Sequence, residues 1–147
     1  MPKINTDFLK SNNRPLVLII HPDINTLYEE KKRLQNRFNW PIVSIGKDLS
    51  RDMLSGKVTG VAAVQAWLID QILGDAPGPV MLSEIDLLFE PSFSLDSLIL
   101  FQRASRFANL VVLWPGMYSG EKVLAYAVPE HAHYRAWRNP DAAVFPL

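Results

Sequence analysis

The sequence predicts a three-layer α/β domain, in which helices cover both faces of a mostly parallel sheet of about five strands. Short apolar runs such as Leu16–Ile20 and Val80–Leu82 show no polar alternation, which is typical of strands buried on both faces. Helical patterns separate these runs, as right-handed βαβ units require. With 147 residues, of which 48% are hydrophobic and 20% charged, the chain fits one globular domain.

The N-terminal half is expected to begin with a polar segment over residues 1–14, followed by a first strand at Leu16–Ile20. Asp23 or Asn25 can cap the helix after this strand, because both side chains accept hydrogen bonds from the free backbone N–H groups of a first helical turn. The next expected elements are a strand over residues 42–45, one or two helical turns over 48–54, a loop over 56–60 and a helix over 61–73.

The C-terminal half is expected to contribute three further strands. A turn over residues 74–79 leads into the strand Val80–Leu82. Ser94 is expected to cap a helix over residues 95–107, with Asp96 placed favourably in its first turn. The remaining expected elements are a strand over residues 110–114 that Pro115-Gly116 breaks, a strand over 123–128, and an unassigned tail over 129–147. No internal repeat or linker divides the sequence, so residues 1–147 are expected to form a single domain.

Composition limits the classes of function. Fifteen basic and fifteen acidic residues cancel, so the chain has no overall attraction to nucleic acid or to a membrane surface. It contains no cysteine, which excludes disulfides, thiol catalysis and cysteine-based metal centres. The polar N-terminus lacks the apolar core of a signal peptide, and no apolar run is long enough to cross a bilayer. We therefore expect a soluble protein of the cytoplasm.

Acidic residues follow the strand Val80–Leu82 at its carboxyl end. Ligands of parallel α/β sheets bind just beyond this end of the strands. In nucleoside triphosphatases an aspartate there holds magnesium, and a neighbouring glutamate polarises the attacking water. Here Ser83 stands in place of the aspartate, Glu84 occupies the glutamate position, and Asp86 follows. Glu84 and Asp86 are therefore candidates for catalysis, and the alternative is that they only cap the following loop by accepting backbone N–H bonds.

A phosphate-binding loop should lie between the first strand and the first helix. It needs glycines, whose backbone N–H groups hold the phosphates, and a lysine followed by serine or threonine. The segment His21–Leu27 contains neither glycine nor lysine, and Asp23 would place negative charge where phosphates bind. The Gly-Lys pairs at Gly46 and Gly56 lack the hydroxyl residue, so we interpret them as exposed loop residues. We expect no cofactor, and ATP with magnesium is the alternative.

Four strings of the sequence together resemble one protein family. They are LSEIDLLFEP, LDSLILFQRASR, LVVLWPG and LAYAVPEHAHYRAW, and the resemblance extends from Pro15 to Trp137. These strings are similar to the BrxF family, a P-loop-containing family of the type 3 BREX phage-defence systems. A weaker likeness is to the BrxB family of the same systems, which also carries a proline-glycine break after a late strand. The resemblance implies a P-loop-NTPase-like fold and work beside larger BREX partners.

The missing phosphate loop and the family resemblance together favour an accessory protein with a degenerate nucleotide-binding fold that binds a larger partner. One alternative is a nucleoside triphosphatase in which Glu84 acts and a partner supplies the missing phosphate contacts. Another is a DNA-binding accessory subunit, which clustering of the arginines on one face would favour and scatter would count against. The arginines concerned are Arg33, Arg37, Arg103, Arg106, Arg135 and Arg138.

The C-terminal third is rich in aromatic residues and arginine, a composition typical of protein interfaces. The predicted partner interface consists of Trp114, Tyr118, Tyr134, Arg135 and Trp137. The alternative is that most of these aromatic side chains lie in the core. Arg103 and Arg106, at the end of the helix over residues 95–107, either complement the helix dipole or reach a phosphate or carboxylate on a neighbouring subunit.

His131 and His133 lie two positions apart and would share one face of an extended segment. With Glu130 and His21 they could bind a transition metal, because imidazole is a ligand of zinc, nickel and iron. Packed or surface histidines are the commoner outcome for such a pair. We therefore predict no metal site, with His131 and His133 as the alternative.

Overall fold

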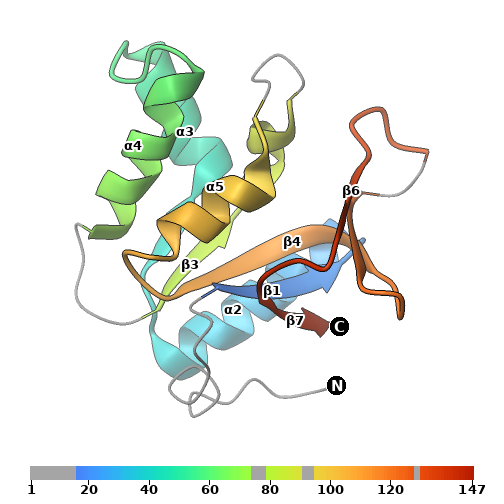
Figure 1. The fold of residues 1–147 in the computed structure, drawn as a ribbon. Coiled ribbons are helices and arrows are strands. Elements are labelled where there is room, and N and C mark those ends of the chain that lie inside the picture. The colour runs from blue at the N-terminus through green and yellow to red at the C-terminus, as the bar shows by residue number, and fades with distance from the viewer. Residues whose placement is uncertain (1–15, 74–78, 91–94, 128–129) are drawn as a thin grey trace.

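The computed structural model describes residues 16–73, 79–90, 95–127 and 130–147, and within these ranges it is an α/β fold with seven strands and four α-helices (Figure 1). Five strands form a parallel sheet in the order β2-β3-β4-β1-β7. They are β1 (Leu16–His21), β2 (Ile42–Ser44), β3 (Val80–Ser83), β4 (Leu110–Tyr118) and β7 (Ala143–Pro146). This arrangement confirms the predicted α/β class with a mostly parallel sheet.

Helices cover both faces of this sheet, which gives the three layers visible in Figure 1. Val17 and Ile19 of β1 pack with Leu34 on one face, whereas Leu18 packs with Leu49 on the other. Burying each such side chain contributes about 1.5–3 kcal/mol, and this requires a helical layer on each side. The first face is covered by α2 (Ile24–Phe38), and the second by α3 (Ile45–Leu54), α4 (Val61–Leu73) and α5 (Ser97–Ala104).

Asp23, one of the two predicted caps, caps the N-terminus of α2. Its backbone is extended, and its carboxylate accepts hydrogen bonds from the Asn25 N–H at 3.1 Å and from the Thr26 hydroxyl at 3.1 Å. The helix ends at Asn39, whose φ of 53° places it in the left-handed region and whose N–H donates to the Gln35 carbonyl at 2.8 Å. At least one free backbone group at each end of α2 therefore has a local partner.

Two helices differ from their predicted bounds. α3 begins at Ile45, directly after β2, so Gly46 lies in its first turn and not in an exposed loop. α5 is shorter than expected, and Asp96 is its N-cap, accepting a hydrogen bond from the Ile99 N–H at 3.1 Å. The predicted cap Ser94 and most of the turn over residues 74–79 lie outside the described residues. α4 has the bounds that its apolar periodicity predicted.

The predicted break at Pro115-Gly116 is wrong, because β4 continues to Tyr118. The strand changes partner at this point: Pro115 is the last residue opposite parallel β1, and Gly116 is the first opposite antiparallel β5 (Val123–Tyr126). Pro115 has no N–H to donate, but its carbonyl accepts the Ala127 N–H at 2.8 Å. The chain then forms β6 (Arg135–Arg138) against β5, and β7 returns beside β1. The unassigned tail thus supplies the two strands beyond the expected five.

Candidate functional site

The carboxyl ends of β1 and β3 lie at the same edge of the sheet. Both strands run parallel to β4, which lies between them, so His21 and Glu84 are placed at one edge as the sequence predicted. From this edge the chain after β1 passes to α2 on one face, whereas the chain after β3 passes to α5 on the other. Open α/β sheets form ligand sites at the carboxyl edge of the strands, where connections leave toward opposite faces.

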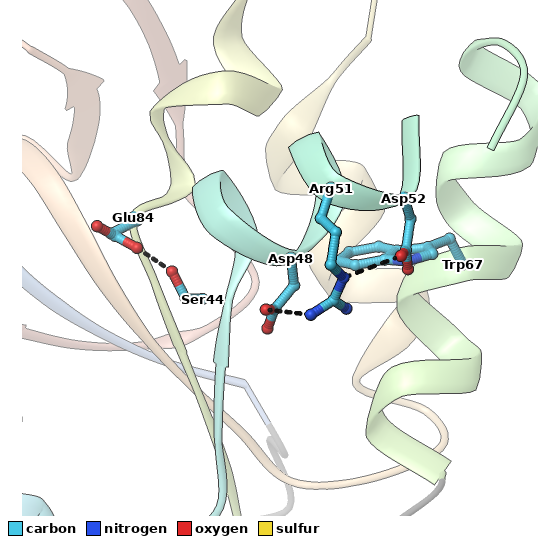
Figure 2. A network of polar contacts seen from close by, with 6 residues as sticks. All are labelled: Ser44, Asp48, Arg51, Asp52, Trp67 and Glu84. Carbon is cyan, nitrogen blue, oxygen red and sulfur yellow. Dashed lines mark hydrogen bonds and ion pairs between the residues drawn. The ribbon is translucent and has the colours of Figure 1, made fainter. Parts of the chain in front are cut away.

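Glu84 is held at this edge by the junction between β2 and α3 (Figure 2). The Ser44 hydroxyl donates to the Glu84 carboxylate, and the Gly46 N–H donates to the Glu84 carbonyl at 2.9 Å. A Cβ at Gly46 would lie only 3.3 Å from both the Cβ and the carbonyl oxygen of Glu84. These contacts arise because Ser44 and Ser83 lie opposite each other in the β2–β3 register. The Ser44 hydroxyl and the close approach at Gly46 therefore define the position of Glu84.

The backbone of Glu84 is in the left-handed region, with φ of 52° and ψ of 51°. For a residue with a Cβ this conformation costs about 1–2 kcal/mol. It ends β3 and starts the 3₁₀ helix Ile85–Phe89. Non-glycine residues in this region concentrate at functional sites, where the surrounding structure supports the strain. Asn39, Lys122, Ala127 and Asn139 also have positive φ, so this conformation supports a functional role for Glu84 only together with its position at the sheet edge.

Asp86 is tied to a different part of the fold. The Tyr126 hydroxyl donates to its carboxylate at 2.6 Å, which joins the 3₁₀ helix to β5. Burial, followed by this hydrogen bond, raises the pKa of Tyr126 well above its ordinary value. Within the described residues, Glu84 makes no side-chain cap to the 3₁₀ helix, and Asp86 accepts a hydrogen bond from a phenol, so neither contact is of the simple capping kind.

Ser83 is buried, with 4% of its surface exposed, and its hydroxyl has no hydrogen-bond partner in the part of the chain that the structure describes. It lies beside a cavity of about 110 Å³ between α2, the end of β4 and the start of the 3₁₀ helix. The residues around this cavity are Ile24, Leu27, Tyr28, Lys31, Ser83, Glu84, Ile85, Asp86, Leu113 and Pro115. We call it the α2 cavity. Both acids predicted as candidates border it, but His21 does not.

A second polar network joins α3 to α4 (Figure 2). Asp52 accepts a hydrogen bond from the Trp67 indole N–H at 2.8 Å and one from Arg51 at 3.2 Å, and Arg51 also pairs with Asp48 at 3.5 Å. The indole bond, with a smaller contribution from Arg51, lowers the pKa of the Asp52 carboxyl. The network ends α3 and fixes it to α4, so we interpret it as structural.

The predicted partner interface is divided between core and surface. Trp114 has none of its surface exposed, and its indole N–H donates to the Ala125 carbonyl at 2.9 Å, so it is a core residue and not a surface anchor. Tyr118 also packs against the core. Trp137 is half-buried, with its ring 5.4 Å from that of Trp114, whereas Tyr134 is 39% exposed.

Arg135 borders a surface cavity that is larger than the α2 cavity. One guanidinium nitrogen donates to the Leu95 carbonyl at 2.6 Å, and another lies 3.9 Å from the Asp96 carboxylate. The cavity has a volume of about 400 Å³, and we call it the C-terminal cavity. It is bordered by Phe89, Glu90, Leu95, Asp96, Ala132, His133, Tyr134 and Arg135. Two of the five predicted interface residues, Tyr134 and Arg135, therefore meet at one hollow in the surface.

The six arginines proposed for DNA binding do not share one face. Arg33 and Arg37 belong to α2 on one side of the sheet, and Arg103 belongs to α5 on the other. Arg33 is also engaged by the buried Glu30 carboxylate, whose hydrogen bond raises the arginine pKa. Arg103 donates to the Gln65 side chain at 3.3 Å. This scatter counts against a single DNA-binding surface.

His131 and His133 are joined by a hydrogen bond between a side chain and the backbone. The Nδ1 atom of His131 accepts the His133 N–H at 3.0 Å, and the two rings lie 5.5 Å apart. In residues 16–73, 79–90, 95–127 and 130–147, no group of three or more histidine or acidic side chains could hold a metal ion.

The sequence did not predict a role at this site for three residues, which are Ser44, Gly46 and Ser83. Ser44 and Glu84 are 40 positions apart, so their contact depends on the strand order. The available signal was the polar residue at the end of each of two apolar strands, Ser44 and Ser83.

Comparisons with protein-family models, with curated proteins and with solved structures give no match for this chain. The likeness to the BrxF family therefore stays a prediction. Among the described helices, none has both the length and the apolar character needed to span a bilayer.

Proposed function

We propose that this protein is an accessory component of a BREX phage-defence system, with a degenerate nucleotide-binding fold, and that it acts by binding a larger protein partner. The resemblance of the sequence to the BrxF family supports the BREX assignment, and the observation that carries the degenerate nucleotide site is the position of Asp23 at the N-terminus of α2. Its carboxylate takes the hydrogen bonds of Asn25 and Thr26 that a phosphate would otherwise accept. A fixed negative charge also opposes the helix dipole's attraction for phosphate.

The segment around Asp23 supports the same conclusion. The Nδ1 atom of His21 accepts the Asp23 N–H at 2.9 Å, so the backbone donor nearest the strand end is also occupied. The cap closes the first turn of α2 without glycine, and the chain provides no lysine there. Calorimetry of the isolated protein is expected to show no micromolar, magnesium-dependent binding of ATP. Binding of that strength would contradict the degenerate-site proposal.

The residues around the C-terminal cavity suit contact with a large partner. The cavity combines the exposed ring of Tyr134 with the guanidinium of Arg135, and both residue types are enriched among energetically dominant interface residues. Arg135 is held in place by the Leu95 carbonyl, so less side-chain entropy is lost when a partner binds. Glu90 and Asp96 also border the cavity and add negative charge to it, and Asp96 lies 3.9 Å from the Arg135 guanidinium.

Co-purification of the tagged protein from its native host tests this proposal. Tyr134→Ala and Arg135→Ala are expected to remain folded and to reduce recovery of the larger BREX component at least tenfold, since such an anchor contributes at least about 2 kcal/mol. Phe107→Ala is the matched control, because Phe107 is 52% exposed but does not border the cavity. Unchanged recovery with folded Tyr134 and Arg135 variants would exclude this surface, and absence of any BREX component would contradict the proposed function.

A second candidate function is nucleotide hydrolysis by Glu84 with phosphate contacts supplied by a partner. The strained backbone of Glu84 and its bond from Ser44 favour this candidate, because they fix a carboxylate at the edge where ligands of such sheets bind. Its test is the ATPase activity of the purified complex with Glu84→Gln. Loss of activity with intact complex assembly would support hydrolysis.

A further inference from the structure

The outer edge of β6 carries backbone groups that point away from the sheet. Among the described strands, β6 pairs with β5 alone. In an antiparallel pair, residues alternate between those that bond to the partner strand and those whose N–H and C=O groups point outward. Asn139 follows β6, and its N–H donates to the carbonyl of Lys122, the residue opposite it, at 2.8 Å. Alternation from this pair leaves the backbone groups of Ala136 and Arg138 pointing outward.

The bonds on the other side of β5 give the same result. The Val123 carbonyl accepts the Ser119 N–H at 3.0 Å, and the Ala127 N–H donates to the Pro115 carbonyl at 2.8 Å. Val123 and Ala127 both have odd numbers, so the odd-numbered residues of β5 bond to β4 and the even-numbered residues bond to β6. The register places even-numbered residues of β5 opposite odd-numbered residues of β6. The even-numbered residues of β6 therefore face outward.

These outward groups are accessible. Ala136 and Arg138 are both exposed, and no backbone hydrogen bond between β6 and a described segment beyond β5 uses them. Each residue offers one N–H and one C=O, and alternate residues of a strand repeat about every 7 Å. An extended polypeptide has matching donors and acceptors at this spacing. Addition of a strand to a sheet edge is an established mode of peptide recognition.

The charge of β6 indicates which strand suits its edge. Arg135 lies 3.9 Å from the Asp96 carboxylate, whereas Arg138 makes no ion pair with a described residue. A second copy of β6 would bring further arginines to the same short edge, and like charges on paired strands are destabilising. An acidic residue on a different chain would instead pair with Arg138. β6 begins at Arg135, which borders the C-terminal cavity, so the edge continues the surface proposed for the larger partner.

We propose that the outer edge of β6 binds an extended segment of the larger protein partner as an added strand, with an acidic side chain of that segment opposite Arg138. The inference rests on the proposed function, in which the protein acts by binding such a partner, and it names how the partner is held. Main-chain hydrogen bonds to Ala136 and Arg138 supply affinity, and the charge of Arg138 selects the sequence. The alternative is a protected edge, because short strands with charged side chains also discourage pairing.

Amide hydrogen exchange of the full chain tests the geometry of the edge. In the free protein, the Trp137 amide is expected to exchange at least about tenfold more slowly than the amides of Ala136 and Arg138, because only Trp137 donates to β5. In the complex with the larger BREX component, the amides of Ala136 and Arg138 should slow by at least about tenfold. Slow exchange of these two amides in the free protein, or no slowing in the complex, would overturn the proposal.

Proline at position 136 tests the edge without removing a bond within the sheet. Ala136→Pro replaces an outward N–H, and proline is tolerated on an edge strand when its position faces solvent. The variant is expected to fold and to reduce recovery of the larger BREX component at least about tenfold in co-purification. Ala136→Thr is the matched control, because it keeps the N–H and should retain recovery. Arg138→Glu should reduce recovery at least about fivefold, and Arg138→Lys should not.

The outcomes separate this inference from the function on which it rests. Unchanged recovery with folded Ala136→Pro would exclude the β6 edge and leave the proposed function in place, whereas unchanged recovery with Arg138→Glu would exclude an acidic residue opposite Arg138. If Ala136→Pro does not fold, amide exchange in the wild-type complex decides. No recovery of a BREX component by the wild type would overturn the function and the inference together. A wild-type dimer in sedimentation equilibrium that Ala136→Pro converts to a monomer would assign the edge to a second copy and overturn the partner.

Discussion

Gly116 packs directly against the carbonyl oxygen of Ala125. A Cβ placed on Gly116 would lie 1.9 Å from that oxygen, which also accepts the indole N–H of Trp114 at 2.9 Å. The contact occurs where β4 leaves β1 and begins to pair with β5. Only glycine allows the two backbones to approach so closely.

Gly116→Ala is therefore expected to destabilise the protein by at least about 1–3 kcal/mol, because backbone atoms must move to admit the new methyl group. Thermal melting should show a decrease of several degrees. Gly120→Ala is the matched control, since a Cβ there meets no atom within 4 Å. A Gly116→Ala variant that melts with the wild type would contradict the geometry of this strand crossing.

Glu84→Gly should be more stable than Glu84→Ala by about 1 kcal/mol, because glycine adopts the left-handed conformation without strain. Both variants lose the bond from Ser44, so their difference isolates the backbone. At Glu90, with φ of −61° and ψ of 124°, the order should reverse. Urea unfolding of the four variants measures this, and the same order at both positions would argue against strain at Glu84.

Asp52 should make stability sensitive to acid. Its folded pKa lies below the ordinary 3.8, so its contribution is complete above that value and is lost as the pH falls through the folded pKa. The unfolding free energy of the wild type should therefore fall more steeply below about pH 4 than that of Asp52→Asn. Trp67→Phe should have an intermediate slope, because it removes the main stabilising donor. Equal slopes in all three proteins would assign the acid sensitivity to another group.

Trp114→Ala is expected to destabilise the protein by about 3–5 kcal/mol, since its fully buried ring packs against Phe89, Phe101 and Trp137. Tyr134→Ala should change the stability by less than about 0.5 kcal/mol, because that side chain is exposed. Thermal melting of the two variants distinguishes core from surface. Similar losses would mean that Tyr134 also belongs to the core.

The elements predicted well from sequence are those defined by local chemistry. The apolar run of β1, the Asp23 cap and the bounds of α4 each depend on residues within one or two turns of the chain. The beginning of α3 was missed because the β2–α3 junction has no intervening loop residues to mark it. β7 was missed because its weak pattern becomes a strand only beside β1.

Part of the candidate site was also predicted from the sequence. The acids after β3 and their shared edge with His21 follow from the rules of parallel sheets. The hydrogen bond from Ser44 to Glu84 could not be predicted, because it joins segments far apart in the sequence. The same holds for the Ser83 hydroxyl, which has no hydrogen-bond partner among the described residues. The prediction that β4 ends after Trp114 was wrong because proline and glycine usually end strands. Here they lie where the pairing partner of β4 changes from β1 to β5.

The pairing of β1 with β7 has a consequence for how the chain is made. Val17 lies opposite Ala143, which is 126 positions later (143 − 17). On the ribosome, β1 must therefore wait for nearly the whole domain to be synthesised before one of its two neighbours exists. During that interval an apolar strand presents an open edge that other chains could join. Rapid completion of synthesis, or a chaperone that covers β1, would protect the nascent protein from aggregation.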